Sequence, residues 1–284
     1  MDRPLKETVY SPDSELLSFG TLMRNMWSDL LDSRELAWRL LVRNISAQYR
    51  QSILGYAWAF IPPLFTALIW IFLNSQNILS IGDTGMPYPV FVIIGVVLWQ
   101  TFIEALHSPM QMVNDSRSML TKINFPREAL ILTGIGQVLF NFVIRALLLV
   151  FVIVWFQIPI HASLLVAPLG VVALIGLGTM IGLLLTPLGM LYHDVGRALG
   201  YATQALFFLT PIIYPVPHAT WAAVLIKLNP VTPLLQTTRD WLTTGQASQL
   251  YGFTWVCGIT VVLLFAGWLM YRIAMPHLIS RMNA

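Results

Sequence analysis

The chain has 284 residues, of which 57% are hydrophobic and 10% are charged, whereas an average soluble domain carries about 25% charged residues. This composition excludes an ordinary soluble globular domain and favours an integral membrane protein. The net charge of +3 does not indicate nucleic-acid binding, because the basic residues follow the membrane topology described below. The single cysteine, Cys257, excludes an intrachain disulfide.

The N-terminal region is polar and lacks the apolar core of a cleavable signal peptide. Residues 1–32 are predicted to form a loosely structured cytoplasmic lead-in. An amphipathic helix is predicted over residues 33–51, with Asp32 as its N-cap and Glu35 in a capping-box position. Its basic stripe and aromatic residues predict that it lies in the membrane interface. Packing against a partner protein is the alternative.

Six apolar runs are candidate membrane spans, since a bilayer core of about 30 Å needs about 20 apolar residues per helix. They cover residues 54–73, 90–107, 129–156, 164–190, 198–213 and 253–271. Pro62 and Pro63 predict a kink or break in the first span. Gly178 and Gly182 form a GxxxG pair in the fourth span, which permits close helix packing and only weakly indicates a dimer face.

The basic residues are distributed very unevenly over the two sides of this pattern. One side holds Arg3, Lys6, Arg24, Arg34, Arg39, Arg43, Arg50, Arg117, Lys122, Arg127, Arg197, Arg272 and Arg281. The other side holds only Lys227 and Arg239, and Arg145 lies within the third span. The positive-inside rule therefore places both termini in the cytoplasm.

The segment around and after the end of the fifth span, residues 211–249, contains too few apolar residues to form two more membrane crossings. Residues 220–228 and 231–242 are predicted to be two short helices separated by Asn229 and Pro230. Two half-helices around a proline break suggest a re-entrant hairpin on the external side, which requires protein or a wet cavity to cover its backbone. An external cap on the surface is the alternative.

No catalytic or metal-binding pattern stands out. The five histidines lie on different loops and span ends without metal-ligand spacing, and there is no GxSxG sequence. There is also no GxxxxGK[ST] loop, so the chain does not supply an ATP site of that kind itself. No catalytic residue, bound cofactor or metal is expected.

Two ionisable residues, Glu104 and Arg145, lie within spans. An intramembrane arginine normally faces a bundle interior or a wet cavity, because it is costly to expose to lipid. Counting along the helices places Glu104 about 15–20 Å nearer the cytoplasm than Arg145. A direct ion pair is therefore not expected, and Arg145 is predicted to face a conduit or an oligomer interface.

Aromatic residues recur at helical spacing in the first and fifth spans. The first span carries Tyr56, Trp58, Phe60, Phe65 and Phe72, and the fifth carries Tyr201 and Phe208. Contact with lipid or ordinary packing is one interpretation, since Trp and Tyr are common at membrane interfaces. If these residues face a conduit instead, their flat apolar rings suit sliding contacts with sugar rings.

Four segments together resemble a known family. They are the basic helix leading into QYRQSILGYAWAFIPPL, the loop NDSRSMLTKINFPREAL, the segment LYHDVGRALGYATQALFFLTPIIYP, and LNPVTPLLQTTRDWL before the last span. The chain resembles the integral-membrane permease of type-two ABC transporters, in the polysaccharide-export branch that moves O-antigen, capsule or teichoic acid chains. The resemblance covers nearly everything after residue 30.

This resemblance implies a homodimer that pairs with two copies of a separate cytoplasmic ATPase, on which ATP and Mg would be bound. It implies that residues 114–127 form the coupling helix and that LYHDVGRAL makes a second contact. The coupling residues would be Arg117, Leu120, Lys122, Phe125, Arg127, Asp194 and Arg197. The first and fifth spans would line the conduit, and Pro211, Tyr214 and Pro215 would belong to the external gate.

Residues 114–127, called the coupling loop below, also have a sequence pattern of their own. Their basic residues flank Met119, Leu120, Ile123 and Phe125, four apolar residues expected to be exposed to the cytoplasm. Buried apolar anchors with charges at the rim suit docking into a groove. An ordinary basic loop that follows the positive-inside rule is the alternative.

The predicted fold is an all-α integral membrane protein in which residues 33–284 form a single permease domain. The predicted function is the permease subunit of an ATP-driven exporter in the bacterial inner membrane, with a polyprenyl-linked glycan as substrate and no enzymatic activity of its own. An export permease for a lipid or a small drug is one alternative. A polytopic membrane enzyme that modifies glycans is another, which the missing acid and histidine cluster disfavours.

Overall fold

The computed structural model describes residues 19–50, 54–78, 81–120, 122, 125–216 and 221–282, and contains no strand among them. The helices are α1 (Phe19–Arg50), η1 (Gly55–Ala59), α2 (Ile61–Ser75), α3 (Tyr88–Asp115), α4 (Arg117–Leu120), α5 (Glu128–Trp155), η2 (Ala162–Leu165), α6 (Ala167–Leu191), α7 (His193–Phe208), α8 (Trp221–Leu228), α9 (Val231–Thr243) and α10 (Leu250–Met282). The all-α prediction is confirmed for these residues.

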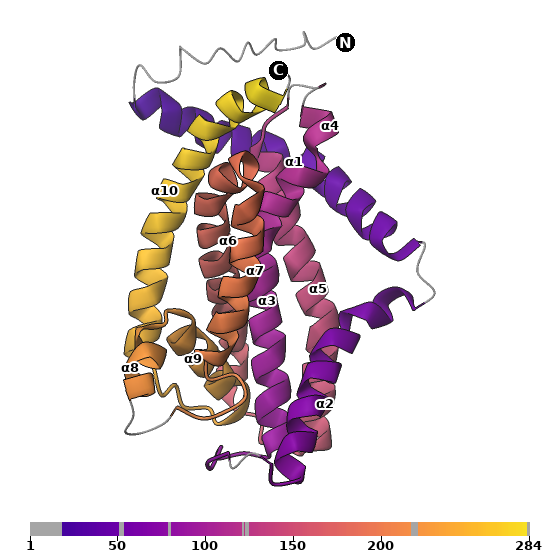
Figure 1. Cartoon of the computed structure of the whole chain (residues 1–284), viewed down its shortest axis with the longest axis vertical. Helices are drawn as coiled ribbons and strands as arrows, with labels where there is room; N and C mark the ends of the chain where they lie inside the picture. Colours follow the sequence, from indigo (N-terminus) through magenta and orange to yellow (C-terminus); the bar gives the residue numbers. More distant parts are fainter. Residues whose placement is uncertain are drawn as a thin grey trace.

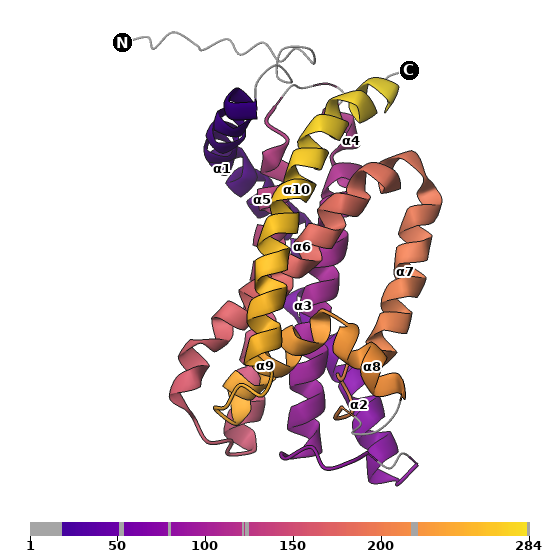
Figure 2. The same ribbon diagram turned by 90° about the vertical axis from the view of Figure 1, so that its left-hand side faces the viewer.

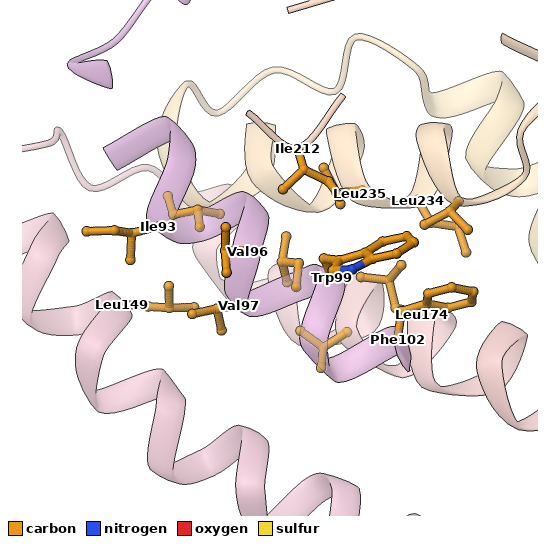
Figure 3. Packing of buried hydrophobic residues seen from close by; sticks show 14 of the residues in the cluster. Ile93, Val96, Val97, Trp99, Phe102, Leu149, Leu174, Ile212, Leu234 and Leu235 are labelled. Atoms are coloured by element: carbon orange, nitrogen blue, oxygen red, sulfur yellow. The ribbon is translucent and has the colours of Figure 1, made fainter. Parts of the chain in front are cut away.

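Helix α3 packs against both α5 and α6, and α10 packs against α6 (Figure 1). α3 is apolar on nearly every side, and a helix of this kind is expected to be buried. Its residues Ile93, Val97 and Phe102 pack with Leu149 of α5, Leu174 of α6 and Leu234 of α9 (Figure 3). α3 is therefore the element against which α5, α6 and α9 pack.

The GxxxG pair of α6 serves this packing within the chain. A Cβ atom added at Gly178 would lie 2.6 Å from the carbonyl oxygen of Phe102, and one at Gly182 would collide with the carbonyl of Leu106. Small residues let two helix backbones approach each other closely. The pair therefore joins α6 to α3.

Four of the described helices, α3, α5, α6 and α10, are long and apolar enough to cross a membrane. α2 has 15 residues and α7 has 16, which gives each a length of about 24 Å or less at 1.5 Å per residue. The prolines of the first span occupy the first turn of α2, so the predicted break falls between η1 and α2. A count of six spans stays a prediction.

Helix α1 is longer than the sequence predicted. It is already helical at Phe19 and runs through Asp32 without interruption, so the predicted N-cap is wrong. The helix continues because Met26 and Ser33 are buried and packed, which fixes a segment that was predicted to be a loose lead-in. Residues 1–18 of that lead-in lie outside the described residues.

One face of α1 rests on α5, where the hydroxyl of Thr133 donates to the carbonyl of Ala37 (3.3 Å). Another face leaves apolar side chains exposed, among them Trp27, Leu31, Trp38 and Val42. These four residues follow helical spacing, so they form one stripe along the helix. An exposed apolar stripe on an otherwise polar helix is a feature of interfacial helices, and the interfacial position of α1 stays a prediction.

The two ends of the bundle have different structures. α1, α4 and the C-terminal end of α10 lie at one end, at the top of Figure 1, and α8, α9 and the N-terminal end of α3 lie toward the other. The two short helices predicted in the external segment are present, and they are separated at Asn229 and Pro230. α9 has most of its side chains buried against α6, α10 and α3, which is unlike a helix lying on the surface.

Candidate functional site

The chain leaves the helical conformation after α7, and the carbonyl groups freed there are bonded by side chains from other elements. Arg239 of α9 donates from Nη1 to the carbonyl of Pro211 (3.1 Å) and from Nη2 to that of Ile212 (2.9 Å). Tyr88, at the start of α3, donates from its hydroxyl to the carbonyl of Ile213 (3.1 Å). Non-helical backbone can be buried when its polar groups are bonded in this way.

Asn229, in the break between α8 and α9, completes this set of contacts. Its side-chain nitrogen donates to the hydroxyl of Thr210 (2.8 Å) and to the carbonyl of Leu209 (3.3 Å). Its side-chain oxygen accepts from the backbone N–H of Val231 (3.0 Å). Asn229 therefore ties the start of α9 to the turn that follows α7.

Arg239 is a functional candidate that the sequence interpretation missed. Its side chain is 3% exposed, and its guanidinium carbon lies 3.7 Å from the centroid of the Phe91 ring. A Cβ atom added at Gly95 would collide with this guanidinium group, so the glycine makes room for the cation. Helical spacing could have indicated that Arg239 is buried, because it lies four residues after Leu235 and therefore on the same face of α9.

The residues predicted for an external gate come together in this turn. Pro211 is buried, and Tyr214 and Pro215 are half-buried. The hydroxyl of Tyr214 donates to the carbonyl of Phe208, and burial raises the pKa of the Tyr214 phenol. A Cβ atom at Gly82 would lie 3.6 Å from Pro215, so the loop before α3 also contacts the turn. Their role in gating stays a prediction.

The predicted conduit aromatics are mostly exposed on α2 and α7 and in the adjoining η1. More than half of the side-chain surface is exposed for Tyr56, Trp58, Phe65, Phe72, Tyr201 and Phe208, while Phe60 is half-buried. α2 and α7 meet where Trp70 contacts Phe208, with ring centroids 6.4 Å apart. Figure 2 shows both helices toward the same side of α3. The bundle thus has an aromatic face that the described residues leave uncovered.

Glu104 and Arg145 form an ion pair between α3 and α5, so the prediction that they lie too far apart is wrong. The sequence interpretation ended the second span at His107, whereas α3 continues two turns further. Glu104 lies about 16 Å from the last residue of α3 and Arg145 about 26 Å from the first residue of α5, and the two long side chains together span the difference. Arg145 is 2% exposed, and its place in a conduit lining stays a prediction.

The predicted coupling residues lie at the end of the bundle that also holds α1. Arg117 of α4 is half-buried and lies 3.9 Å from the sulfur of Met190 in α6, while Lys122 is exposed. Arg127 is half-buried, and its carbonyl is 3.5 Å from the hydroxyl of Tyr271. The described part of the coupling loop is thus held against α6 and α10.

One premise of the docking prediction is wrong. Leu120 is 7% exposed and packs with Leu40, Val113 and Leu130, so it is not free to anchor a partner. The short α4 turns this side chain back toward the bundle. Met119 and Phe125 are half-buried against the same cluster, and Ile123 lies outside the described residues. The exposed surface of this loop includes Ser118 and Lys122.

The second predicted contact, at the start of α7, is exposed, and its role in docking stays a prediction. Asp194 and Arg197 form an ion pair of 3.5 Å across one helical turn, with 91% and 80% of their side chains exposed. Exposed pairs of this kind add little to stability. The contact between Arg117 and Met190 places α4 next to the end of α6, from which α7 begins.

A buried cluster of charges beside the coupling loop was not foreseen. Arg272 of α10 bonds to Asp29 of α1 (2.7 Å) and to Glu128, the first residue of α5 (2.9 Å). Arg272 and Glu128 are both less than a tenth exposed. A single guanidinium group therefore joins the three elements that surround the end of the coupling loop.

Among the described residues, no group of three or more His, Cys, Asp and Glu residues is arranged to hold a metal ion. The arrangement of the described residues is that of a helical bundle with a hydrogen-bonded turn after α7 at one end, the loop that contains α4 at the other end, and exposed aromatic side chains on α2 and α7.

Sequence comparison identifies relatives of the chain. The model of the ABC-2 type transporter family matches residues 35–243. The O-antigen export system permease protein RfbA of Myxococcus xanthus is 26% identical over 248 residues, which cover 84% of this chain and 92% of that protein. RfbA of Klebsiella pneumoniae is 24% identical over 82% of this chain and 91% of its own length. The polysialic acid transport protein KpsM of Escherichia coli is 24% identical with the same coverage.

Proposed function

Because the chain belongs to the ABC-2 type transporter family, we propose that it is the membrane-spanning permease subunit of an ATP-driven exporter of lipid-linked polysaccharide. The observation that carries this proposal is the extent of the similarity: relatives named for O-antigen export or polysialic acid transport match over at least 91% of their own length. The exposed aromatic face of α2 and α7 supports the same substrate, because aromatic rings suit contact with sugars.

In this proposal the chain crosses the inner membrane six times, with both termini in the cytoplasm. α2 and α7 join the four longer helices as spans, and their exposed aromatic faces line a conduit between two copies of the chain. The substrate is a glycan linked to a polyprenyl diphosphate. Two copies of a cytoplasmic ATPase bind ATP and Mg, so the permease itself catalyses no reaction.

Helix α3 is the element that connects the two ends. Its last residues continue into α4, where the ATPase docks, and its first residue, Tyr88, bonds to the turn that forms the external gate. A packed helix moves as a rigid rod, so a displacement at one end reaches the other. Rocking of α3 by the ATPase would thus shift the carbonyl groups around Ile213 and open the gate.

The test is genetic complementation. A strain that lacks this chain should accumulate lipid-linked glycan in its cytoplasm and lose surface polysaccharide, and the intact gene should restore both to normal. A cytoplasmic ATPase of the ABC type should co-purify with the chain from the restored strain. Normal surface polysaccharide in the deletion strain would contradict the proposed function.

A further inference from the structure

A cavity lies between α3 and α5 and has no assigned role. Its volume is about 300 Å³, which is about ten times the share of one molecule in liquid water and close to the lower limit for small-molecule sites. The polar side chains that line it are Glu104, His107, Ser108 and Gln111 of α3, and Gln137 and Asn141 of α5. This is an unusual concentration of polar groups between two apolar helices.

The position of the cavity follows from the helix that forms one of its walls. Gln111 lies about one turn, and Glu104 about three turns, from the end of α3 that leads into α4. On the other wall, Asn141 follows Phe140, whose ring centroid is 6.2 Å from that of Tyr56. The cavity therefore lies beside the end of the aromatic face nearer the coupling loop.

The charges around the cavity cancel. Glu104 accepts from Arg145 at one carboxylate oxygen and from the amide of Asn141 at the other (3.4 Å). None of the described lining residues is a lysine or an arginine. A cavity of this kind has no excess positive charge for a diphosphate and no free carboxylate for a metal ion. Its chemistry suits a neutral ligand.

The polar groups that remain both donate and accept hydrogen bonds. A side-chain amide has two donors and an acceptor, and a neutral imidazole has one of each. The side-chain oxygen of Gln137 is buried and has no partner, although its nitrogen donates to Gln48 (3.2 Å). A buried acceptor without a partner is costly, so it calls for a donor from a ligand or from water.

We propose that this cavity binds one sugar ring of the exported glycan through its hydroxyl groups. Each hydroxyl group donates one hydrogen bond and accepts others, which matches the mixed amide and imidazole lining. The apolar parts of the wall, from Ile103, Met112 and Val138, contact the C–H groups of the ring. The choice of a sugar rests on the proposed function, while the neutral polar character of the cavity does not.

The experiment measures ATP-dependent uptake of lipid-linked glycan into inverted membrane vesicles that contain the permease and its ATPase. The double variant Gln111→Leu/Gln137→Leu removes two amides and leaves the Glu104–Arg145 pair in place. Its apparent KM for the glycan should rise about tenfold, which corresponds to the loss of two ordinary hydrogen bonds, while the maximal rate stays unchanged. An unchanged KM would overturn the proposal.

Gln48→Leu is the matched control, because Gln48 bonds to Gln137 without lining the cavity. It should leave the KM unchanged. An equal rise in KM for Gln48→Leu would trace the effect to the contact between α1 and α5 and would overturn the sugar site. If the parent protein takes up no glycan at all, the proposed function fails and the sugar site fails with it.

Thiol labelling identifies what fills the cavity. In a Cys257→Ser background, Gln111→Cys should react with a membrane-permeant maleimide about tenfold more slowly when an ATPase variant that cannot hydrolyse ATP traps lipid-linked glycan. Asn25→Cys, on the exposed face of α1, should react equally with and without glycan. Fast labelling of Gln111→Cys in both states would show that water alone fills the cavity. Slow labelling in both would show that lipid or a second copy covers it, and either result would overturn the proposal.

Discussion

Arginines 145, 239 and 272 are buried in the part of the chain that the structure describes, and they are stabilised in different ways. Arg145 and Arg272 bond to carboxylates, whereas Arg239 bonds to two backbone carbonyls and stacks over Phe91. Hydrogen bonds from a charged donor are stronger than neutral ones. The guanidinium group also holds two neighbouring carbonyls at once, which a lysine ammonium group on a flexible stem does less well.

Replacement of Arg239 should therefore loosen the turn after α7. Arg239→Met leaves the carbonyls of Pro211 and Ile212 buried without donors, which costs about 1–3 kcal/mol for each group. The apparent melting temperature of the purified permease should fall by about 5 °C or more. Arg239→Lys should recover only part of this loss. A melting temperature equal to that of the parent for Arg239→Met would show that the turn does not depend on the arginine.

For the Glu104–Arg145 pair, a second substitution should compensate for the stability lost with the first. Arg145→Leu leaves the Glu104 carboxylate without its cation between two apolar helices, so glycan export and thermal stability should both fall. Adding Glu104→Gln removes the unpaired charge and should restore most of the stability. Melting curves and surface polysaccharide are measured for both variants. A double variant that is less stable than Arg145→Leu alone would show that the carboxylate does not depend on this cation.

Among the elements, α1 and α4 differ most from what local sequence suggested. A capping pattern at Asp32 predicted where α1 begins, but the buried contacts of Met26 and Ser33 extend the helix past it. Similarly, the charges of the coupling loop were visible in the sequence, whereas the inward turn of Leu120 depends on α4 packing against residues far away in the chain. The charges of the coupling loop therefore predict on which side of the membrane it lies, whereas tertiary contacts decide which of its residues remain exposed.

The exposed part of the coupling loop is the place to test docking. Ser118→Trp adds a bulky side chain at the exposed surface of α4 without touching the buried Leu120, so it should hinder a closely packed interface. The amount of ATPase that co-purifies with the permease should fall about tenfold, which is the effect of about 1.4 kcal/mol. Gln249→Trp, exposed at the other end of the bundle, is the control and should retain normal binding. Equal recovery of the ATPase with both variants would remove α4 from the interface.

For the molecule as a whole, the sequence predicted the helical bundle and the two short helices α8 and α9 well. Long apolar runs identify spans because the thickness of the bilayer fixes their length. Helix ends were less predictable: α3 passes through Pro109, which packs against Gly182 of α6. Glu104 therefore lies farther from the end of α3 than the sequence suggested, within reach of the Arg145 side chain. The contacts of Arg239 and Arg272 join residues distant in sequence, so no local pattern could have indicated their partners.

The central claim is that this bundle, driven by a separate ATPase, moves a polysaccharide on a lipid carrier. The most direct measurement reconstitutes the purified permease and its ATPase in liposomes and follows the transfer of lipid-linked glycan across the bilayer. Transfer should require ATP and should stop when the ATPase carries a substitution that prevents hydrolysis. A complex that hydrolyses ATP and extrudes a small drug or a simple lipid, but leaves the lipid-linked glycan in place, would contradict the account.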